Sequence, residues 1–224
     1  MRKYAIIVAG GKGERMNMSV PKQFAELCGK PVLMHSLEAF HLFDASVKLI
    51  VVLPSLQLDV WKSLCHRYDF DIPHAVITGG ASRFESVKNG MDVIKEVSIV
   101  AVHDGVRPVV SINLIERLFA SAEKNGNAVP VVPVRDSLRR IEGESNMAVD
   151  RSTLYCVQTP QCFHSSQLRS MYELPFDGKY TDDASLADAC GFKVHTEEGD
   201  PVNIKITVAT DLQIAEMFLK KGQT

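Results

Sequence analysis

A glycine-rich segment close to the N-terminus, Ala9-Gly10-Gly11-Lys12-Gly13, is the part of the sequence most suggestive of chemistry. It directly follows an apolar run at residues 4–8 that is typical of a buried strand. Because glycine has no side chain, the backbone N–H groups of Gly10, Gly11 and Gly13 can approach an anion closely. The segment therefore predicts a phosphate-binding loop, with an ordinary strand-to-helix turn as the alternative.

Two familiar nucleotide-binding patterns do not fit this loop. The dinucleotide pattern G-x-G-x-x-G needs a third glycine where Met16 stands, and the P-loop needs Gly-Lys where Met16-Asn17 stand. A dinucleotide-binding oxidoreductase also predicts an acidic residue at the end of the second strand, where Leu53-Pro54-Ser55 occur. The loop therefore favours a different class of phosphate-binding protein.

Two cationic residues follow the loop, Arg15 and then Lys22 within Pro21-Lys22-Gln23-Phe24. Fixed cations beside a phosphate-binding loop suit phosphoryl or nucleotidyl transfer, because charge builds up on the non-bridging phosphate oxygens in those reactions. Either residue alone could be an ordinary surface charge. Together with the glycines, they predict a transferase that acts on phosphates.

Two further charged residues occur where a buried strand is expected to end or to run. Asp104 ends an apolar run at residues 99–103, so it should lie at the carboxyl edge of a sheet, where ligands bind in open α/β folds. A turn or helix cap is the alternative for this residue. Lys205 lies in a strand-like run at residues 202–206, and an unpaired charge facing a core would be costly. We therefore expect Lys205 to point into a polar cleft.

The elements that must position these residues alternate along the chain. Short apolar runs predict strands at residues 4–8, 48–53, 75–78, 99–102 and 127–132. Between them, apolar residues recur at helical spacing, as at Leu33, Leu37 and Phe40, at Phe84, Val87 and Met91, and at Leu114, Leu118 and Ala122. This alternation predicts an α/β fold of Rossmann-like type: a doubly wound, mostly parallel sheet with helices on both faces.

The alternation of predicted strands and helices ends after Pro133. Residues 134–140 and 147–151 flank a turn-rich stretch at residues 142–146, which predicts a protruding β-hairpin arm at about residues 136–157. A two-stranded ribbon alone is only marginally stable, so we expect the arm to pack on a second copy of the chain, giving a homodimer. Strands are then expected at residues 192–196 and 202–206, and a last helix capped by Thr210.

The amino-acid composition limits the classes of protein to which the chain can belong. The 224 residues are 46% hydrophobic with a net charge of −2, which is typical of a single globular domain over residues 1–224 and excludes a protein-wide basic surface for nucleic acid. No apolar run approaches the roughly 20 residues of a membrane span, and the N-terminus lacks the features of a signal peptide. Five cysteines without a C-x-x-C pair favour a reduced, cytoplasmic enzyme.

The loop and the residues after it resemble the nucleotidyltransferases that activate small phosphates with a nucleoside triphosphate. Further matching strings lie at residues 79–87, 102–108, 133–137, 149–151, 158–161, 180–185 and 203–207, so the resemblance spans nearly the whole chain. They narrow the resemblance to the cytidylyltransferase family, and within it to the branch that uses CTP and 2-C-methyl-D-erythritol 4-phosphate in non-mevalonate isoprenoid biosynthesis. The ribitol 5-phosphate branch is the nearest alternative, and a non-catalytic nucleotide-binding regulator is a third.

The resemblance implies a role for each matching residue on the nucleotide side. Arg15 and Lys22 would stabilise the transition state at the α-phosphate of CTP. The backbone of Ala9 and Gly10 would contact the cytosine, as would the region of Gly80 and Ser86, and Gly11 and Gly13 would lie on the triphosphate. Ala81 departs from the family, in which an acidic residue commonly follows the two glycines.

On the acceptor side, the resemblance places Asp104 beside the triphosphate and its Mg²⁺, directly or through water or phosphate. Arg107 and Thr181 would contact the methylerythritol phosphate. Lys205 would bind the phosphate of the same substrate, and Arg151, on the arm, would reach it from the neighbouring subunit. The bidentate fork of an arginine suits this duty, whereas an exposed arm residue is the simpler interpretation of Arg151.

Overall fold

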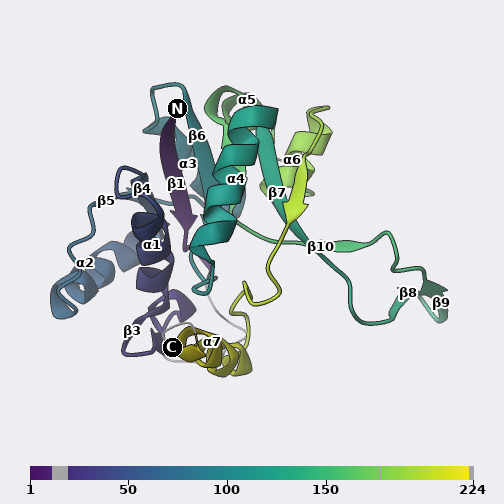
Figure 1. Ribbon diagram of the computed structural model, residues 1–224, viewed down its shortest axis with the longest axis horizontal. Coiled ribbons are helices and arrows are strands. Elements are labelled where there is room, and N and C mark those ends of the chain that lie inside the picture. Colours follow the sequence, from purple (N-terminus) through teal and green to yellow (C-terminus); the bar gives the residue numbers. More distant parts are fainter. Residues whose placement is uncertain (12–19, 177, 222–224) are drawn as a thin grey trace.

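A mostly parallel sheet forms the centre of the protein, in a computed structural model that describes residues 1–11, 20–176 and 178–221 (Figure 1). Its strands lie in the order β10-β7-β11-β6-β1-β4-β5, with β12 paired to β7. Their bounds are β1 (Arg2–Val8), β4 (Lys48–Leu53), β5 (His74–Thr78), β6 (Ser98–Asp104), β7 (Asn127–Pro133), β10 (Tyr155–Val157), β11 (Gln161–His164) and β12 (Thr196–Glu198).

Strand pairing confirms the predicted doubly wound arrangement. β1 pairs in parallel with both β4 and β6, and β4 pairs in parallel with β5. β11 runs antiparallel between β6 and β7. Because the parallel strands end at the same edge, Val8 and Asp104 lie opposite each other in the register of β1 and β6.

Helices cover both faces of this sheet, and the two faces have separate cores. One core contains Ile7 together with residues of α1 (Val32–Phe43), α2 (Leu58–Arg67) and α4 (Ile112–Asn125). The other contains Ile6 together with residues of α3 (Arg83–Asp92), α5 (Ser165–Met171) and α6 (Asp183–Ala189). Successive residues of β1 thus alternate between the faces, as the pleat of a strand requires. In the described part of the chain, no helix combines the length and apolar character needed to cross a bilayer.

Among the described helices, α3, α4 and α6 begin at side-chain caps. Ser82 accepts a hydrogen bond from the backbone N–H of Glu85 at the start of α3, and Ser111 does the same for α4. Asp182 and Ser185 form a capping box at the start of α6. These caps fix where the loops that precede α3 and α6 must turn.

The last part of the chain differs from the sequence-based expectation. Residues 202–206 form no strand, and only Thr196–Glu198 pairs, as β12. The segment runs over the sheet edge instead, where Ile206 donates its backbone N–H to Val106 and packs with α7 (Ala209–Lys221). The apolar alternation there therefore reflects this local packing.

The predicted cap of the last helix is wrong as well. α7 already includes Thr210, and the side chain of Asp211 caps the turn before it by accepting the backbone N–H groups of Thr207 and Val208. A carboxylate near the helix start satisfies donors that a threonine would leave to water.

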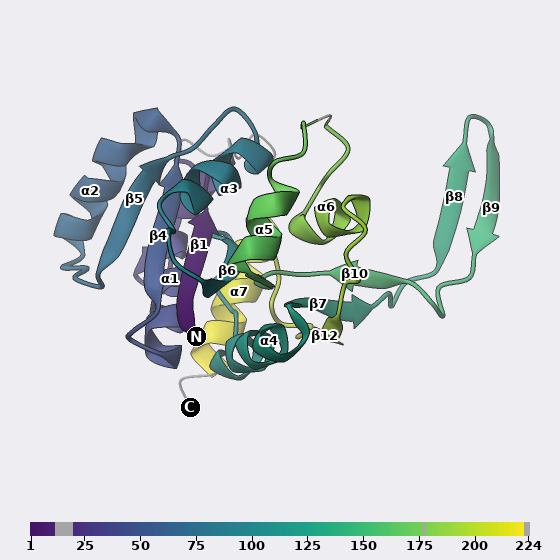
Figure 2. The same ribbon diagram turned by 90° about the horizontal axis from the view of Figure 1, so that it is seen from above.

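The predicted hairpin is present, with different bounds. β8 (Leu138–Glu142) and β9 (Ser145–Val149) form a ribbon that projects away from the body of the molecule (Figure 2). The arm ends earlier than expected, because Tyr155–Val157 returns to the main sheet as β10 and pairs with β7. A small third sheet, β2 (Glu26–Leu27) with β3 (Lys30–Pro31), lies beside α7. The described part of the chain also contains the short 3₁₀ helices η2 (Lys22–Phe24) and η3 (Ser55–Gln57).

Candidate functional site

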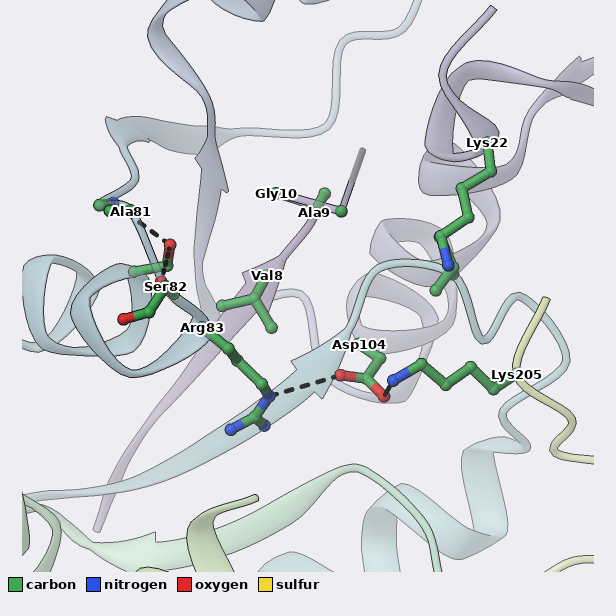
Figure 3. Close-up of a pocket in the computed structure, with 13 residues that line it drawn as sticks. Val8, Ala9, Gly10, Lys22, Ala81, Ser82, Arg83, Asp104 and Lys205 are labelled. Carbon is green, nitrogen blue, oxygen red and sulfur yellow. Dashed lines mark hydrogen bonds and ion pairs between the residues drawn. The ribbon is translucent and has the colours of Figure 1, made fainter. Parts of the chain in front are cut away.

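A cavity of about 260 Å³ opens at the carboxyl edge of the parallel strands (Figure 3). It lies where the predicted loop after β1 meets the start of α3 and the end of β6. Many of the residues predicted to bind the nucleotide line it. The lining consists of Val8, Ala9, Gly10, Gly11, Lys22, Gly80, Ala81, Ser82, Arg83, Ser86, Asp104, Val106 and Lys205.

A second cavity, of about 340 Å³, adjoins the first on the side of α6. Arg107 and Thr181, which were predicted to contact the acceptor, both line it. Its full lining is Arg83, Asp104, Arg107, Val157, Gln158, Thr159, Gln161, Thr181, Asp182 and Lys205. Arg83, Asp104 and Lys205 belong to both cavities, so these three residues form the wall between them.

Asp104 is the centre of this wall. Its carboxylate lies 2.9 Å from Lys205 Nζ, 3.5 Å from Arg107 Nε and 3.7 Å from Arg83 Nε. Burial by itself raises the pKa of the Asp104 carboxyl, but Arg83, Lys205 and Arg107 lower it by more, so the net pKa lies well below its usual value. Asp104 is therefore an anion that holds three cationic side chains at the boundary of the two cavities.

Lys205 confirms the expectation that its charge points into a polar cleft, although it does not lie in a strand. Figure 3 shows its ammonium group directed at Asp104. The backbone on either side of Lys205 is held by hydrogen bonds. Arg107 donates to the carbonyl oxygen of Asn203, and the backbone N–H of Ile206 donates to the carbonyl oxygen of Val106. The segment thus carries Lys205 across the opening of both cavities.

Lys22 also lines the first cavity and is buried, so it is not the ordinary surface charge that was the alternative interpretation. Its Nζ atom donates to the carbonyl oxygen of Ile206 at 3.1 Å. The adjacent Gln23 donates from Nε2 to the carbonyl oxygen of Ala9 at 2.8 Å. The Pro21–Phe24 stretch therefore links the first loop to the chain segment that carries Lys205.

Two packing restraints shape the floor of the first cavity. A side chain at Gly105 would meet Leu33 Cδ1 at 2.8 Å, so any larger residue there would force the core beside the cavity to shift. Ser86 accepts the backbone N–H of Gly80 and donates to the carbonyl oxygen of Ser82. Gly80 and Ser86, both predicted to lie near the cytosine, are thus held together by a direct hydrogen bond.

Ala81 stands where the family resemblance leads one to expect an acidic side chain, and a neighbouring carboxylate accepts its backbone N–H. Glu85 Oε2 accepts that N–H at 2.5 Å. The carboxylate also lies beside Gly80, where an added Cβ would be 2.6 Å from Glu85 Oε2. The negative charge therefore remains next to this turn, supplied from the first turn of α3.

His103 is fully buried next to Asp104 in the sequence. One ring nitrogen lies 3.2 Å from the carbonyl oxygen of Arg107 and the other 3.2 Å from Thr159 Oγ1. Burial lowers the pKa of His103 to about 4, so the ring is neutral at pH 7. It supports the loop between Asp104 and Arg107.

A four-residue stretch, Gln158–Gln161, holds the second cavity together. Gln158 bonds through both ends of its amide to the backbone of Asp200, and Thr159 Oγ1 accepts the N–H of Asp104. Gln161 accepts the N–H of Ala184 and donates to Asp182 Oδ2. Three segments that carry Lys205, Asp104 and Thr181 are therefore fastened to one short stretch.

The structure brings most predicted site residues to these two cavities, with three exceptions. Gly13 and Arg15 lie outside the described residues. Arg151 lies at the base of the arm, is exposed, and lines neither cavity. Sequence reasoning did not assign Arg83, Gln158 or Gln161, although all three occur in strings that carried the family resemblance.

The wall offers one carboxylate to a metal ion. Asp182 also lines the second cavity, but its oxygens already accept hydrogen bonds from Ser185 and Gln161. Among the described residues, no group of three or more His, Cys, Asp or Glu side chains is arranged to hold a metal. A single carboxylate fits Mg²⁺, which keeps several waters and takes its other ligands from substrate phosphates.

Comparison with known proteins gives a consistent result. Residues 4–221 match the family model described as 2-C-methyl-D-erythritol 4-phosphate cytidylyltransferase. A protein of that name from Bacteroides thetaiotaomicron is 46% identical over 98% of this chain and 100% of its own length, and one from Azobacteroides pseudotrichonymphae is 47% identical over 97% and 99%.

Solved structures agree with the sequence relatives. The 2-C-methyl-D-erythritol 4-phosphate cytidylyltransferase of Thermus thermophilus has a TM-score of 0.77 and 31% identity, covering 98% of this chain and 100% of that one. The 4-diphosphocytidyl-2C-methyl-D-erythritol synthase of Anaerococcus prevotii has a TM-score of 0.82 and 27% identity, covering 98% of both chains. The similarity therefore extends over the whole chain.

Proposed function

This chain belongs to the 2-C-methyl-D-erythritol 4-phosphate cytidylyltransferase family, and from that premise we propose how its two cavities share the reaction. CTP binds in the first cavity and 2-C-methyl-D-erythritol 4-phosphate in the second. The products are 4-diphosphocytidyl-2-C-methyl-D-erythritol and pyrophosphate, in non-mevalonate isoprenoid biosynthesis. The observation that carries this assignment of cavities is their common wall of Arg83, Asp104 and Lys205.

The reaction requires no nucleophile from the protein. A phosphate oxygen of the acceptor attacks the α-phosphorus of CTP in line, and the bond to the bridging oxygen of pyrophosphate breaks. The attacking oxygen is already anionic, so the protein must hold two polyanions together and stabilise the charge of the transition state. Lys22 lies in the first cavity and Lys205 in the wall, and we assign Arg15 to the same charge stabilisation on the family resemblance.

We propose that the reaction depends on Mg²⁺, held by Asp104 directly or through water and otherwise by phosphate oxygens. The ion would neutralise part of the triphosphate charge. Removing Mg²⁺ with excess EDTA should abolish turnover and leave the thermal unfolding midpoint of the ligand-free protein unchanged, because substrate supplies most of the ligands. Turnover that persists in excess EDTA would refute the dependence.

The acceptor is tested by a pyrophosphate-release assay. We expect release with CTP and 2-C-methyl-D-erythritol 4-phosphate, and at least about tenfold lower kcat/KM with ribitol 5-phosphate or with ATP, GTP or UTP. Preference for ribitol 5-phosphate would place the chain in the alternative branch. Absence of release with either acceptor would reject the function.

We further propose a homodimer in which the arm of one subunit completes the site of the other. Arg151 lines neither cavity of its own chain, and the ribbon β8–β9 is exposed except at Leu138 and Val149, which are half-buried. An isolated ribbon of this size is only marginally stable, so a packing partner is expected. In a twofold dimer the partner's Lys22 and Lys205 would then share a site with Arg151.

Mixing two inactive variants tests the shared site. After verified subunit exchange between Lys22→Ala and Arg151→Ala proteins, random pairing makes half of the dimers mixed, each with one intact site. Activity should therefore recover to about a quarter of the wild-type value. If Arg151 acts in the site of its own chain, every site lacks either Lys22 or Arg151, and mixing restores no activity.

A cytoplasmic location is also part of the proposal. The five cysteines are all free thiols and include no C-x-x-C pair. Thiols persist in this form in reducing compartments.

A further inference from the structure

Arg83 lines both cavities but has no role in the reaction proposed above. It is the first residue of α3, and its side chain lies in the wall shared by the nucleotide cavity and the acceptor cavity. Figure 3 shows it reaching from α3 toward Asp104. The bond between the two substrates must form at this boundary, because an acceptor oxygen meets the α-phosphorus of CTP there.

One edge of the Arg83 guanidinium is anchored. Its Nη2 atom lies 2.7 Å from Asp183 Oδ2, and Asp183 is fully buried. The hydroxyl of Tyr172 donates to the other carboxylate oxygen of Asp183 at 2.5 Å. This chain of contacts holds the Nη2 end of the guanidinium in place.

The other edge is directed at the cavities. Arg83 Nε lies 3.7 Å from Asp104 Oδ1, an ion pair that is longer than a hydrogen bond. The side chain is 27% exposed, and its hydrogen bond to Asp183 is made by Nη2, one of three guanidinium nitrogens. A guanidinium carries five N–H donors in a planar fork that matches two oxygens of a phosphate. Several donors of Arg83 are thus available to a ligand at the wall.

A purely structural role would explain the contact with Asp183 but not the rest of the arrangement. Neutralising a buried carboxylate requires only one edge of the guanidinium. The free edge instead shares Asp104 with Lys205, to which the family resemblance gives the acceptor phosphate. Arg83 therefore lies where phosphate groups of both substrates come together.

We propose that Arg83 is a catalytic residue that contacts phosphate oxygens of both substrates at the wall, with Asp183 and Tyr172 as its positioning residues. On binding, phosphate oxygens replace Asp104 as partner of the free edge of the guanidinium. The inference rests on the proposed function, since it assumes that CTP and a phosphorylated acceptor occupy the two cavities.

Initial-rate kinetics of Arg83→Lys test the role. Lysine keeps the charge but lacks the planar fork. We expect kcat/KM to fall at least about tenfold for CTP and for the acceptor, with an unfolding midpoint close to that of the wild type. Arg169→Lys is the matched control, because Arg169 donates to the carbonyl oxygen of Ile94 away from both cavities and should retain wild-type kinetics.

A second variant separates catalysis from folding. Replacing Arg83 alone by a neutral residue would leave Asp183 as an unpaired buried charge, so Arg83→Gln is combined with Asp183→Asn. This double variant should be folded, show at least about a hundredfold lower kcat, and regain part of it on addition of guanidinium chloride at millimolar concentration. Rescue would not occur if Arg83 only balanced Asp183, because that charge is absent in the variant.

Kinetic constants within about threefold of wild type in Arg83→Lys would overturn the inference. If the double variant does not fold, Arg83→Lys alone decides. If the wild-type protein itself transfers no cytidylyl group, the proposed function fails, and Arg83 is then judged by calorimetric binding of inorganic pyrophosphate. An affinity about tenfold weaker in Arg83→Lys would support the phosphate contact, and an unchanged affinity would reject it.

Discussion

Replacing Lys22 by methionine should separate catalysis from stability. Methionine has a similar length and suits a buried position, so the cavity wall keeps its shape. The lost hydrogen bond to the carbonyl oxygen of Ile206 costs about 1–3 kcal/mol, because that oxygen is left without this donor. For a protein of this size each kcal/mol lowers the unfolding midpoint by about 2–4 °C. A loss near the middle of the range, about 2 kcal/mol, corresponds to a drop of about 4–8 °C.

The effect on turnover should be much larger. Removing one preorganised donor from a developing negative charge typically lowers kcat by about 100- to 1000-fold. We therefore expect that loss in steady-state pyrophosphate release, measured at a temperature at which differential scanning fluorimetry shows the variant to be folded. Lys30→Met is the control, because it also removes a lysine with a polar partner, here Glu38, but Lys30 lines neither cavity. A folded Lys22→Met protein whose kcat is within about tenfold of wild type would refute the reasoning.

Two further predictions concern Gln161, which holds the second cavity in shape, and the buried histidines His35 and His103. Gln161→Ala removes the acceptor of the Ala184 N–H and the donor to Asp182, so urea unfolding should show a loss of about 2–3 kcal/mol, and KM should rise for the acceptor but not for CTP. Lowering the pH from about 7 to about 5 should lower the free energy of unfolding, because burial depresses the pKa of His35 and of His103, so the unfolded chain binds protons that the folded protein excludes. That loss begins as the pH falls through about 6.5, and His35→Gln should reduce the difference between urea unfolding curves at the two pH values. A pH-independent unfolding curve, or an unchanged acceptor KM in Gln161→Ala, would contradict these expectations.

The features that depend on local sequence were predictable. The bounds of β4 match the predicted residues 48–53, and Asp104 ends β6 at the expected edge. Both follow from apolar runs that need no information from elsewhere in the chain. The direction of Lys205 was predictable too, because a charge cannot face a core without a partner, and this argument holds whether or not the segment is a strand.

Features made by distant segments were not predictable in this way. Lys22 is buried because Ile206, 184 residues further along the chain, folds over it. Arg83 gains its anchor from Asp183, 100 residues away, so the string around Arg83 gives no sign of that partner. The position of α7's first turn likewise depends on Asp211 reaching back to Thr207, which competes with the threonine cap that the local pattern favours.

The contacts of Gln158–Gln161 have a consequence for how this chain can change in length. The stretch meets three distant segments within four residues, so one inserted or deleted residue would displace at least one of its side chains from its partner. The turn between β8 and β9 has no such constraint within its own chain, because Gly143 there has open space around it and the flanking residues are exposed. Length variation among related sequences should therefore gather at the tip of the arm and be absent from the stretch before β11.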